Sequence, residues 1–472
     1  MRKSKVYGAS ITAFFSLTLS VLLLMIFTFL RIGIIGSEKQ RFELASNLAL
    51  NSALGEFSKA LYEKYDLLYI DASYLGKEPC IDNVAQRIEY YMTENAQNVY
   101  LKANAPWGRI KINKVMIDGF ECATSGELRN MTNQAVMYVE DSSSLNYLVE
   151  EESMALEAAI SASVLDATDP IEEFRGYKAV VDGIPLPKKK DKKGKLVEVP
   201  VSNPADWVYG LSESDMGFLT NNAGNNISST CIDISQLISH RGAQNTVGMN
   251  GNYRFDDTCY GAYEIDKFGC FLNERPDTVL RLQMEYIAFG KDNDYANFSD
   301  VLERIFKWRL SDNLSLAFSD GTIVAEAYSI ASELEVSTLN PAFIKPVADT
   351  IVASCAYLET ISDVRCLVRG GRIPISKTAH NMKVSNVLTG NIYEVLSSEG
   401  LSYRQYLECM IFLEPLDQRL LRNMDLMEME VRKDSSNDRF CMDFCVEEVA
   451  VSMVGSGTGI REYSLKRRYG YF

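Results

Sequence analysis

The stretch ITAFFSLTLSVLLLMIFTFL, from Ile11 to Leu30, decides the architecture of this 472-residue chain. It contains 20 consecutive residues without a charge, and as a helix it would cover about 30 Å, the thickness of the hydrocarbon core of a bilayer. The alternative is a cleaved secretory signal, whose apolar core is usually only ~7 to 15 residues long and ends in a small-x-small cleavage site. Here the apolar run continues past Arg31 to Gly36. We therefore predict a short basic leader over residues 1–10 and a retained transmembrane helix over residues 11–35.

The charge of the chain divides at the end of this segment. The whole chain has 48 Lys and Arg, 63 Asp and Glu, and a net charge of −15. Residues 1–35 hold four basic residues and no acidic one, so the remainder carries 44 basic and 63 acidic residues, a net charge of −19. A balance of this sign argues against broad binding to nucleic acid. The short leader and the lack of a second apolar run of this length favour a cytoplasmic N-terminus, with residues 36–472 outside the cell membrane.

Helical periodicity continues beyond the apolar run. After Gly36, apolar residues recur at spacings typical of one face of a helix: Phe42, Ala45, Leu48, Ala49, Ala53, Phe57, Leu61 and Tyr65. The pattern predicts a stalk helix over Phe42–Tyr65 that packs on the acidic body, with Gly33, Gly36 and Gly55 as weak points.

The rest of the chain predicts an α+β fold, a mostly helical ectodomain with small antiparallel sheets. We expect a membrane-proximal α+β unit over residues 36–165, with strands at Leu67–Leu75 and Arg109–Gly119 and helices at Ile81–Gln97, Glu127–Val139 and Leu145–Ala162. Residues 166–230 are rich in Pro, Lys and Asn and predict a loop or linker. Its lysine run KKKDKKGK, Lys188–Lys195, is typical of a solvated tip between two strands, although such a run could also contact an anionic lipid or an acidic partner.

Residues 231–472 predict a second, mostly helical α+β unit. Tyr- and Phe-rich residues 252–272 indicate a hairpin, and three helical patterns follow around residues 279–289, 301–308 and 343–361. Two more helices are expected on either side of Pro415. Residues 440–454 and 460–472 flank GSGTG, in which Gly455, Gly457 and Gly459 fit a hairpin turn better than a phosphate-binding loop because no helix follows them.

The cysteines and histidines predict neither a metal centre nor a cofactor. Ten cysteines lie on the expected outer side, where disulfides form, and Cys259 with Cys270 is the pair we expect because it brackets the predicted hairpin. Other cysteines fit equally well as small buried apolar residues. His240 and His380 stand alone, and Cys441 with Cys445 lacks further ligands for zinc.

No catalytic residues are predicted, and we expect a protein without enzymatic activity. The chain contains no G-x-S-x-G, H-E-x-x-H or P-loop motif. Asp256 with Asp257, and Asp292 with Asp294, could hold calcium, but they lack the ligand spacing of an EF-hand and are more typical of solvated loops.

Several stretches of the chain resemble one family. The head Gly8–Leu17, the segment Leu61–Tyr74 and three body segments, Leu282–Arg309, Ile361–Thr378 and Gly400–Leu413, are similar to membrane-anchored proteins of Gram-positive bacteria associated with Tad-type (tight adherence, Flp) pilus systems. The most specific part is Asp-Val-Arg at residues 363–365 followed by Gly-Gly-x-x-Pro at residues 370–374.

The resemblance implies a minor pseudopilin or assembly subunit. Its partners would be the lipid bilayer and other pilus or secretion-system subunits, contacted through the N-terminal helix, and Gly8–Ala9 would be the site of prepilin-type processing. Pilins usually carry a Glu five residues after the cleaved glycine, where this chain has Ala13. A processed filament subunit and a permanently anchored assembly component therefore both remain open, and so do two rivals: a sensory or ligand-binding ectodomain on a single-span tether, and a surface hydrolase with an unrecognised acidic site.

Overall fold

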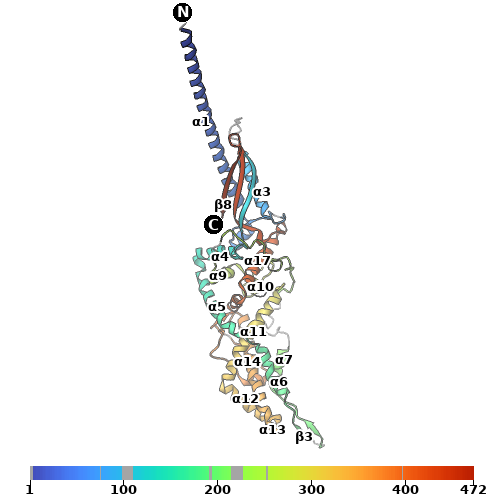
Figure 1. Ribbon diagram of the computed structural model, residues 1–472. Coiled ribbons are helices and arrows are strands. Elements are labelled where there is room, and N and C mark those ends of the chain that lie inside the picture. The colour runs from blue at the N-terminus through green and yellow to red at the C-terminus, as the bar shows by residue number, and fades with distance from the viewer. Residues whose placement is uncertain are drawn as a thin grey trace. The chain divides into compact units, whose positions relative to one another are not determined.

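The computed structural model describes residues 4–74, 76–97, 110–190, 194–213, 227–250, 253–395 and 397–472. It confirms the predicted fold class, an α+β protein with one long N-terminal helix, a mostly helical body and small antiparallel sheets (Figure 1). Two compact units make up the chain. We call residues 1–135, 242–255 and 427–472 the anchor unit, and residues 136–241 and 256–426 the helical unit.

The anchor unit begins with α1, a single 51-residue helix over Ser4–Leu54. Gly33 and Gly36 do not interrupt it, whereas the chain leaves the helix at Gly55 and resumes as α2 (Lys59–Tyr65). The predicted stalk helix is therefore two helices, and the reason is local pairing. Phe57 forms a bridge with Ile70, and the amide of Ser58 donates to the carbonyl of Tyr69 at 2.8 Å.

One antiparallel sheet completes this unit. Its central strand β7 (Cys445–Gly457) pairs along one side with β2 (Ile110–Cys122) and along the other with β8 (Tyr463–Gly470) and the short β1 (Ile70–Asp71). β2 confirms the strand expected at Arg109–Gly119, β7 with β8 confirms the closing hairpin, and the strand expected at Leu67–Leu75 is reduced to β1.

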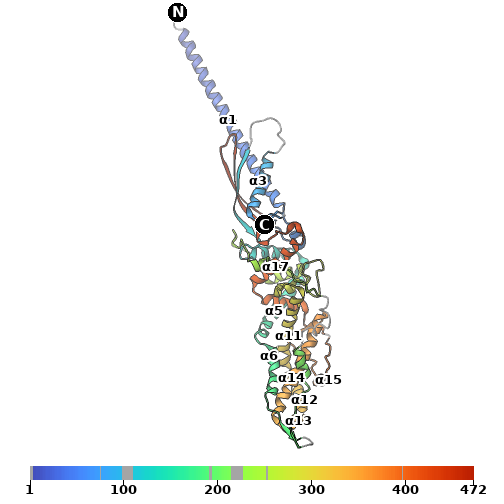
Figure 2. The ribbon, with the colours of Figure 1, turned by 90° about the vertical axis from the view of Figure 1, so that its right-hand side faces the viewer.

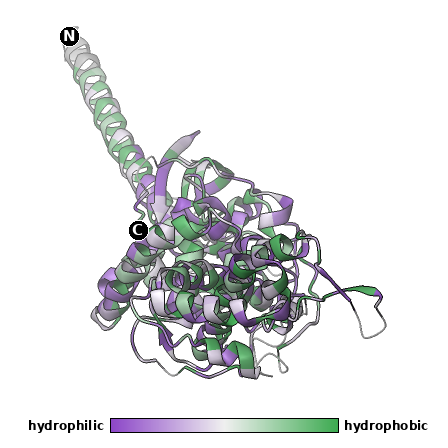
Figure 3. Ribbon diagram, turned by 90° about the horizontal axis from the view of Figure 1, so that it is seen from below, coloured by the Kyte–Doolittle hydropathy of each residue, from purple (hydrophilic) through white to green (hydrophobic). Residues whose placement is uncertain are grey.

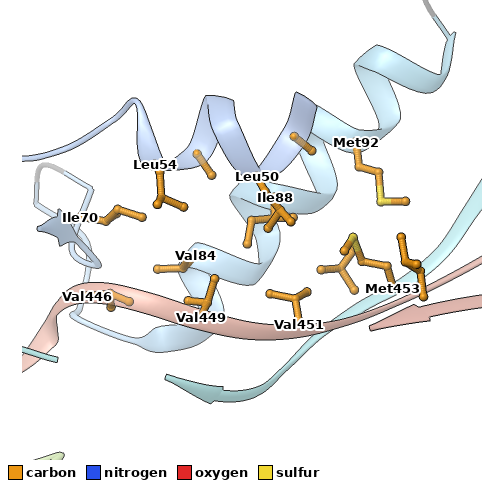
Figure 4. Packing of buried hydrophobic residues seen from close by; sticks show 14 of the residues in the cluster. Leu50, Leu54, Ile70, Val84, Ile88, Met92, Val446, Val449, Val451 and Met453 are labelled. Atoms are coloured by element: carbon orange, nitrogen blue, oxygen red, sulfur yellow. The ribbon is translucent and has the colours of Figure 1, made fainter. Parts of the chain in front are cut away.

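The core of the anchor unit lies between the C-terminal half of α1, the helix α3 (Ile81–Gln97) and the sheet (Figures 1 and 2). Figure 4 shows Leu50 and Leu54 of α1 and Val84, Ile88 and Met92 of α3 directed toward the strand β7. The opposing strand side chains are Val446, Val449, Val451 and Met453. The hydrophobic contacts thus join segments separated by some four hundred residues in the sequence.

The helical unit is built around α14 (Ile344–Val368), in which 20 of 25 residues are buried. The helices α6 (Pro170–Asp182), α11 (Asp294–Ser319) and α12 (Gly321–Glu333) pack against it. The remaining helices are α5 (Asn146–Leu165), α7 (Asp206–Ser212), α8 (Ile238–Arg241), α9 (Asp257–Lys267), α10 (Gln283–Phe289), α13 (Glu335–Leu339), α15 (Val384–Thr389) and α16 (Tyr403–Leu413), while α4 (Arg129–Asp141) and α17 (Leu416–Arg432) contribute to both units. Two small two-stranded antiparallel sheets complete it: β3 (Lys188–Lys190) with β4 (Leu196–Glu198), and β5 (Arg372–Ile373) with β6 (Leu401–Ser402).

Two expectations need correction. The predicted hairpin over residues 252–272 is wrong, because this segment forms α9, whose first turn is capped by Asp256 accepting from the amide of Cys259 at 2.9 Å. Residues 166–230 are less irregular than expected, since they contain α6 and α7. The lysine run does belong to a two-stranded hairpin, of which the structure describes Lys188–Lys190 and residues 194–198.

The compact units also differ from the contiguous blocks 36–165 and 231–472 expected from the sequence. Residues 427–472 return to pair with β2 and pack on α1, so the anchor unit takes both ends of the chain. Residues 242–255 join it as well: the carbonyl of Thr246 accepts from the amide of Glu127 at 3.2 Å.

Candidate functional site

The N-terminal half of α1 is an apolar helix without protein around it. Every side chain from Ile11 to Gly33 is exposed, including Phe15 at 66% and Leu24 at 65%, and Figure 3 shows this half of the helix in hydrophobic colours. Hydroxyl groups in this half donate to backbone carbonyls of the same helix: Ser20 donates to Ser16 at 2.8 Å and Thr28 donates to Met25 at 2.7 Å. The helix is therefore long and apolar enough to span a membrane, as predicted.

The free segment ends at a set of contacts that we call the collar: Glu38 and Phe42 of α1 with Gly455, Gly457 and Gly459 at the tip of the β7–β8 hairpin. The carboxylate of Glu38 is only 1% exposed and accepts from the amide of Thr458 at 2.7 Å and from that of Gly459 at 2.9 Å. The ring of Phe42 meets that of Tyr463 edge to face, with centroids 5.0 Å apart. The collar thus marks the level at which α1 passes from free to packed.

Close contact with α1 explains why the hairpin tip carries glycines. A Cβ at Gly455 would overlap the ring of Phe42, and one at Gly457 would overlap the carboxylate of Glu38. The expected hairpin turn is confirmed, and its amides bind an anion supplied by the chain's own helix. Glu38 was not among the residues predicted from the sequence to be functional. The sequence feature that could have indicated it is an acidic residue at the start of the apolar stripe, four residues before Phe42.

The predicted stalk stripe is largely buried. Phe42, Ala45, Ala49 and Ala53 of α1 and Leu61 and Tyr65 of α2 are buried, whereas Leu48 remains 44% exposed. Gly8 and Ala9, the residues expected to be processed, lie in the described backbone of α1.

No disulfide joins Cys259 and Cys270, the expected pair. The hairpin that would have brought them together does not exist. Cys259 lies in the first turn of α9 and Cys270 follows its last residue. The helical turns between them extend over roughly 12 Å, beyond the Cα separation that a disulfide bridges.

The four aspartates considered for calcium each have a local structural partner. Asp256 caps α9, and Asp257 lies 3.4 Å from the guanidinium of Arg419. Asp292 accepts from the side chain of Asn293 at 2.8 Å, and the buried Asp294 accepts from the amides of Arg281 and Leu282. Their roles are therefore in capping and loop geometry.

A buried group of possible metal ligands occurs elsewhere in the anchor unit. Ligand atoms of Glu428, Cys441 and Asp443 lie within 4.8 Å of one another. The guanidinium of Arg432 already sits among them, 3.0 Å from the carboxylate of Glu428 and 3.4 Å from the sulfur of Cys441. Two of the three side chains therefore already interact with a cation of the chain's own, and Glu428 forms an ion pair with Arg432.

The segments that carry the family resemblance meet in the helical unit around Arg309. This fully buried guanidinium donates to Asp363 at 3.1 Å and to the carbonyls of Pro374 and Ile375 at 3.0 and 2.7 Å. Lys377 pairs with Glu359 and Asp363 at 2.7 and 2.5 Å. Asp363 of the Asp-Val-Arg motif and Pro374 of the Gly-Gly-x-x-Pro motif therefore connect α14 and the loop after it to Arg309 of α11.

These observations describe an α+β protein with one N-terminal helix that is long and apolar enough to cross a membrane. Residues 194–457 match a family described as a family of unknown function, DUF5702, and because the match covers more than half of the chain, the protein belongs to that family. No curated protein and no solved structure matches the chain.

Proposed function

We propose that this protein is a non-enzymatic, membrane-anchored extracellular component of a Tad-like pilus or surface assembly, either a minor pseudopilin or an assembly subunit. The observation that carries the proposal is the continuity of α1. One unbroken helix presents an exposed apolar surface over its first half and is held by the collar and the core over its second half.

Such a helix can exchange one apolar environment for another. Lipid tails and the side chains of neighbouring transmembrane helices are similarly apolar, so the free half of α1 can leave lipid for adjacent subunits with little change in burial. Because the collar and the core hold the sheet of the anchor unit against α1, movement of the helix would carry this sheet with it. The basic residues Arg2, Lys3 and Lys5 support an orientation with the N-terminus inside the cell.

Photo-crosslinking in the native bacterium tests the proposal. A photoreactive amino acid replaces Leu22, which is 55% exposed in the free half of α1, and in a matched variant it replaces the fully buried Leu50 of the same helix. We expect the probe at residue 22 to capture proteins of the pilus or its secretion machinery, and the probe at residue 50 to give none of these products. Crosslinks from residue 22 to lipid alone would refute an assembly role and favour a single-span tether.

The mature N-terminus separates the two routes within the proposal. Sequencing of the membrane-extracted protein that begins at Ala9 would support the pseudopilin route, and an intact Met1 would support a permanently anchored assembly subunit. A start beyond residue 36 would remove the free half of α1 and overturn the proposal.

A further inference from the structure

The anchor unit contains a cavity of about 860 Å³ beside the break between α1 and α2. Its walls come from that break, from the turn after β1, from α3 and from the chain that follows α17. Its volume lies in the range of sites that enclose small ligands. The cavity lies within one compact unit and does not involve the collar or the free half of α1.

The charges of the wall nearly cancel. Its anions are Glu56, Glu63, Asp71 and Asp434, and its cations are Lys59, Lys77 and Arg87. Glu56 and Arg87 are paired through both carboxylate oxygens, one contact being 2.6 Å between the guanidinium Nε and Oε2. Apart from this pair, the wall holds three carboxylates, which would repel a polyanion, and two ammonium groups, which would repel a polycation. The wall therefore favours a ligand without net charge.

The uncharged part of the wall combines aromatic rings with amides. The rings belong to Phe57, Tyr74, Tyr90 and Phe440, and the amides to Asn83, Gln86 and Asn437. Tyr90 is 52% exposed, and its ring is held by the guanidinium of Arg87, 5.2 Å from the ring centroid. Aromatic faces receive the C–H faces of a ligand, while amides and carboxylates offer donors and acceptors for hydroxyl groups.

Tyr74 marks the cavity in a second, independent way. Its backbone has a φ of +42°, in the left-handed region that a bulky residue rarely adopts. Its hydroxyl is buried and has no hydrogen-bond partner among the residues that the structure describes. Burial, together with the carboxylate of Glu56, raises the pKa of this hydroxyl, so it retains its proton. Backbone strain and an unused buried donor are features that collect at ligand sites.

We propose that this cavity binds a neutral, polyhydroxylated ligand, namely a short oligosaccharide, with the ring of Tyr90 as a stacking platform and the amides of α3 as hydroxyl partners. The alternative macromolecular ligand is a peptide segment. A peptide that adds to a sheet edge needs an exposed row of backbone groups, and among the described residues of the wall only Asp71 of β1 belongs to a strand. The inference does not rest on the proposed assembly function.

The test uses the full chain in lipid nanodiscs, because many detergents carry sugar head groups. Saturation-transfer NMR and titration calorimetry would measure binding of maltotriose, cellotriose and N-acetylchitotriose, with inorganic phosphate and the tripeptide Ala-Lys-Ala as charged probes. We expect at least one trisaccharide to bind, and Tyr90→Ala to weaken its binding about five- to tenfold, as loss of an aromatic contact does. Gln86→Ala, at an exposed position of α3, should also weaken it.

A matched control is Tyr147→Ala in α5, where the side chain is 60% exposed and outside the cavity. It should leave the affinity within twofold of the natural chain. The proposal is overturned if no trisaccharide binds at millimolar concentration, if only phosphate or the tripeptide binds, or if Tyr90→Ala and Tyr147→Ala have the same effect. None of these outcomes bears on crosslinking from residue 22, so the two proposals can fail separately.

Discussion

The collar yields the most direct prediction, because a single carboxylate holds the hairpin tip against α1. Replacing Glu38 with alanine removes the acceptor for the amides of Thr458 and Gly459. A hydrogen bond to a charged group contributes ~1.5–3 kcal/mol when its partner cannot be replaced by water. Thr458 is exposed, so water recovers part of the loss at this site. We therefore expect the free energy of opening of the tip to fall by about 2 kcal/mol in total.

The assay is hydrogen exchange read by mass spectrometry on peptides that cover residues 455–460. The informative amide is that of Gly457, since it donates to the carbonyl of Ile460 at 2.8 Å and the substitution leaves this acceptor in place. A loss of about 2 kcal/mol corresponds to exchange faster by roughly 30-fold. Glu38→Gln keeps one acceptor oxygen and should give an intermediate rate.

The matched control is Gln40→Ala, at an exposed position of the same helix two residues away. It removes a polar side chain of similar length from α1 and should leave exchange at Gly457 within twofold of the natural chain. If Glu38→Ala and Gln40→Ala exchange at the same rate, the carboxylate does not hold the tip and the reasoning about the collar fails.

Three further predictions concern the helical unit, whose unfolding can be followed by the fluorescence of Trp207 and Trp308. Burial raises the pKa of the Glu408 carboxyl, which interacts with the carboxyl of Glu152, so the native state retains a proton that the unfolded chain releases. The free energy of unfolding should therefore fall as the pH rises from 5 to 8, and Glu408→Gln should flatten this dependence in urea titrations at pH 5 and pH 8. Arg309→Met leaves the buried Asp363 without its guanidinium partner and should lower the free energy of unfolding by about 3–5 kcal/mol. The control Lys307→Met, on the same helix, should change this free energy by less than ~0.5 kcal/mol. Equal urea midpoints for the two variants would contradict the role given to Arg309. Gly400→Ala should lower the free energy of unfolding by more than about 1 kcal/mol, because Gly400 has a φ of +101° and a Cβ would overlap the backbone of Pro374. Gly390 has a φ of +70° but open space around it, so comparison with Gly390→Ala separates the steric part of the loss from the conformational part.

Elements with a regular local pattern could be predicted from the sequence. The alternating Ile and Val residues of β2 and the one-sided helix α3 follow periods of two and 3.6 residues, and the structure places both close to the expected bounds. The helix α9 could not be recognised from its composition, because its Tyr residues favour strands and its Gly residue disfavours a helix interior. Tyr260 and Tyr263 are three residues apart and fully buried, and the ring of Tyr260 packs against the guanidinium of Arg419, which comes from α17. Tertiary contact therefore decides the conformation of this segment.

The candidate sites were harder to predict from the sequence, because they are formed by contacts between residues far apart in the chain. The free half of α1 was evident from 20 uncharged residues, but the collar joins Glu38 to residues 458 and 459. The cavity draws its wall from α2, α3, the turn after β1 and the chain after α17. No local sequence period indicates such contacts, so Glu38 in the collar and Tyr74 in the cavity wall could be identified only from the fold.

The bounds of the family match acquire a physical meaning from the sheet. The match ends at Gly457, the last residue of β7, whereas the strands that pair with β7 are all outside it: β1 and β2 precede residue 194, and β8 begins at Tyr463. A fragment of residues 194–457 would carry a 13-residue, largely buried strand with both of its edges unpaired, which is the condition for aggregation. We expect that fragment to be insoluble and residues 37–472, which keep all four strands and the collar's Glu38, to be soluble. A soluble, monomeric fragment 194–457 would show that β7 does not need its partners, and the anchor unit would then not be the cooperative structure that the pairing of both chain ends implies.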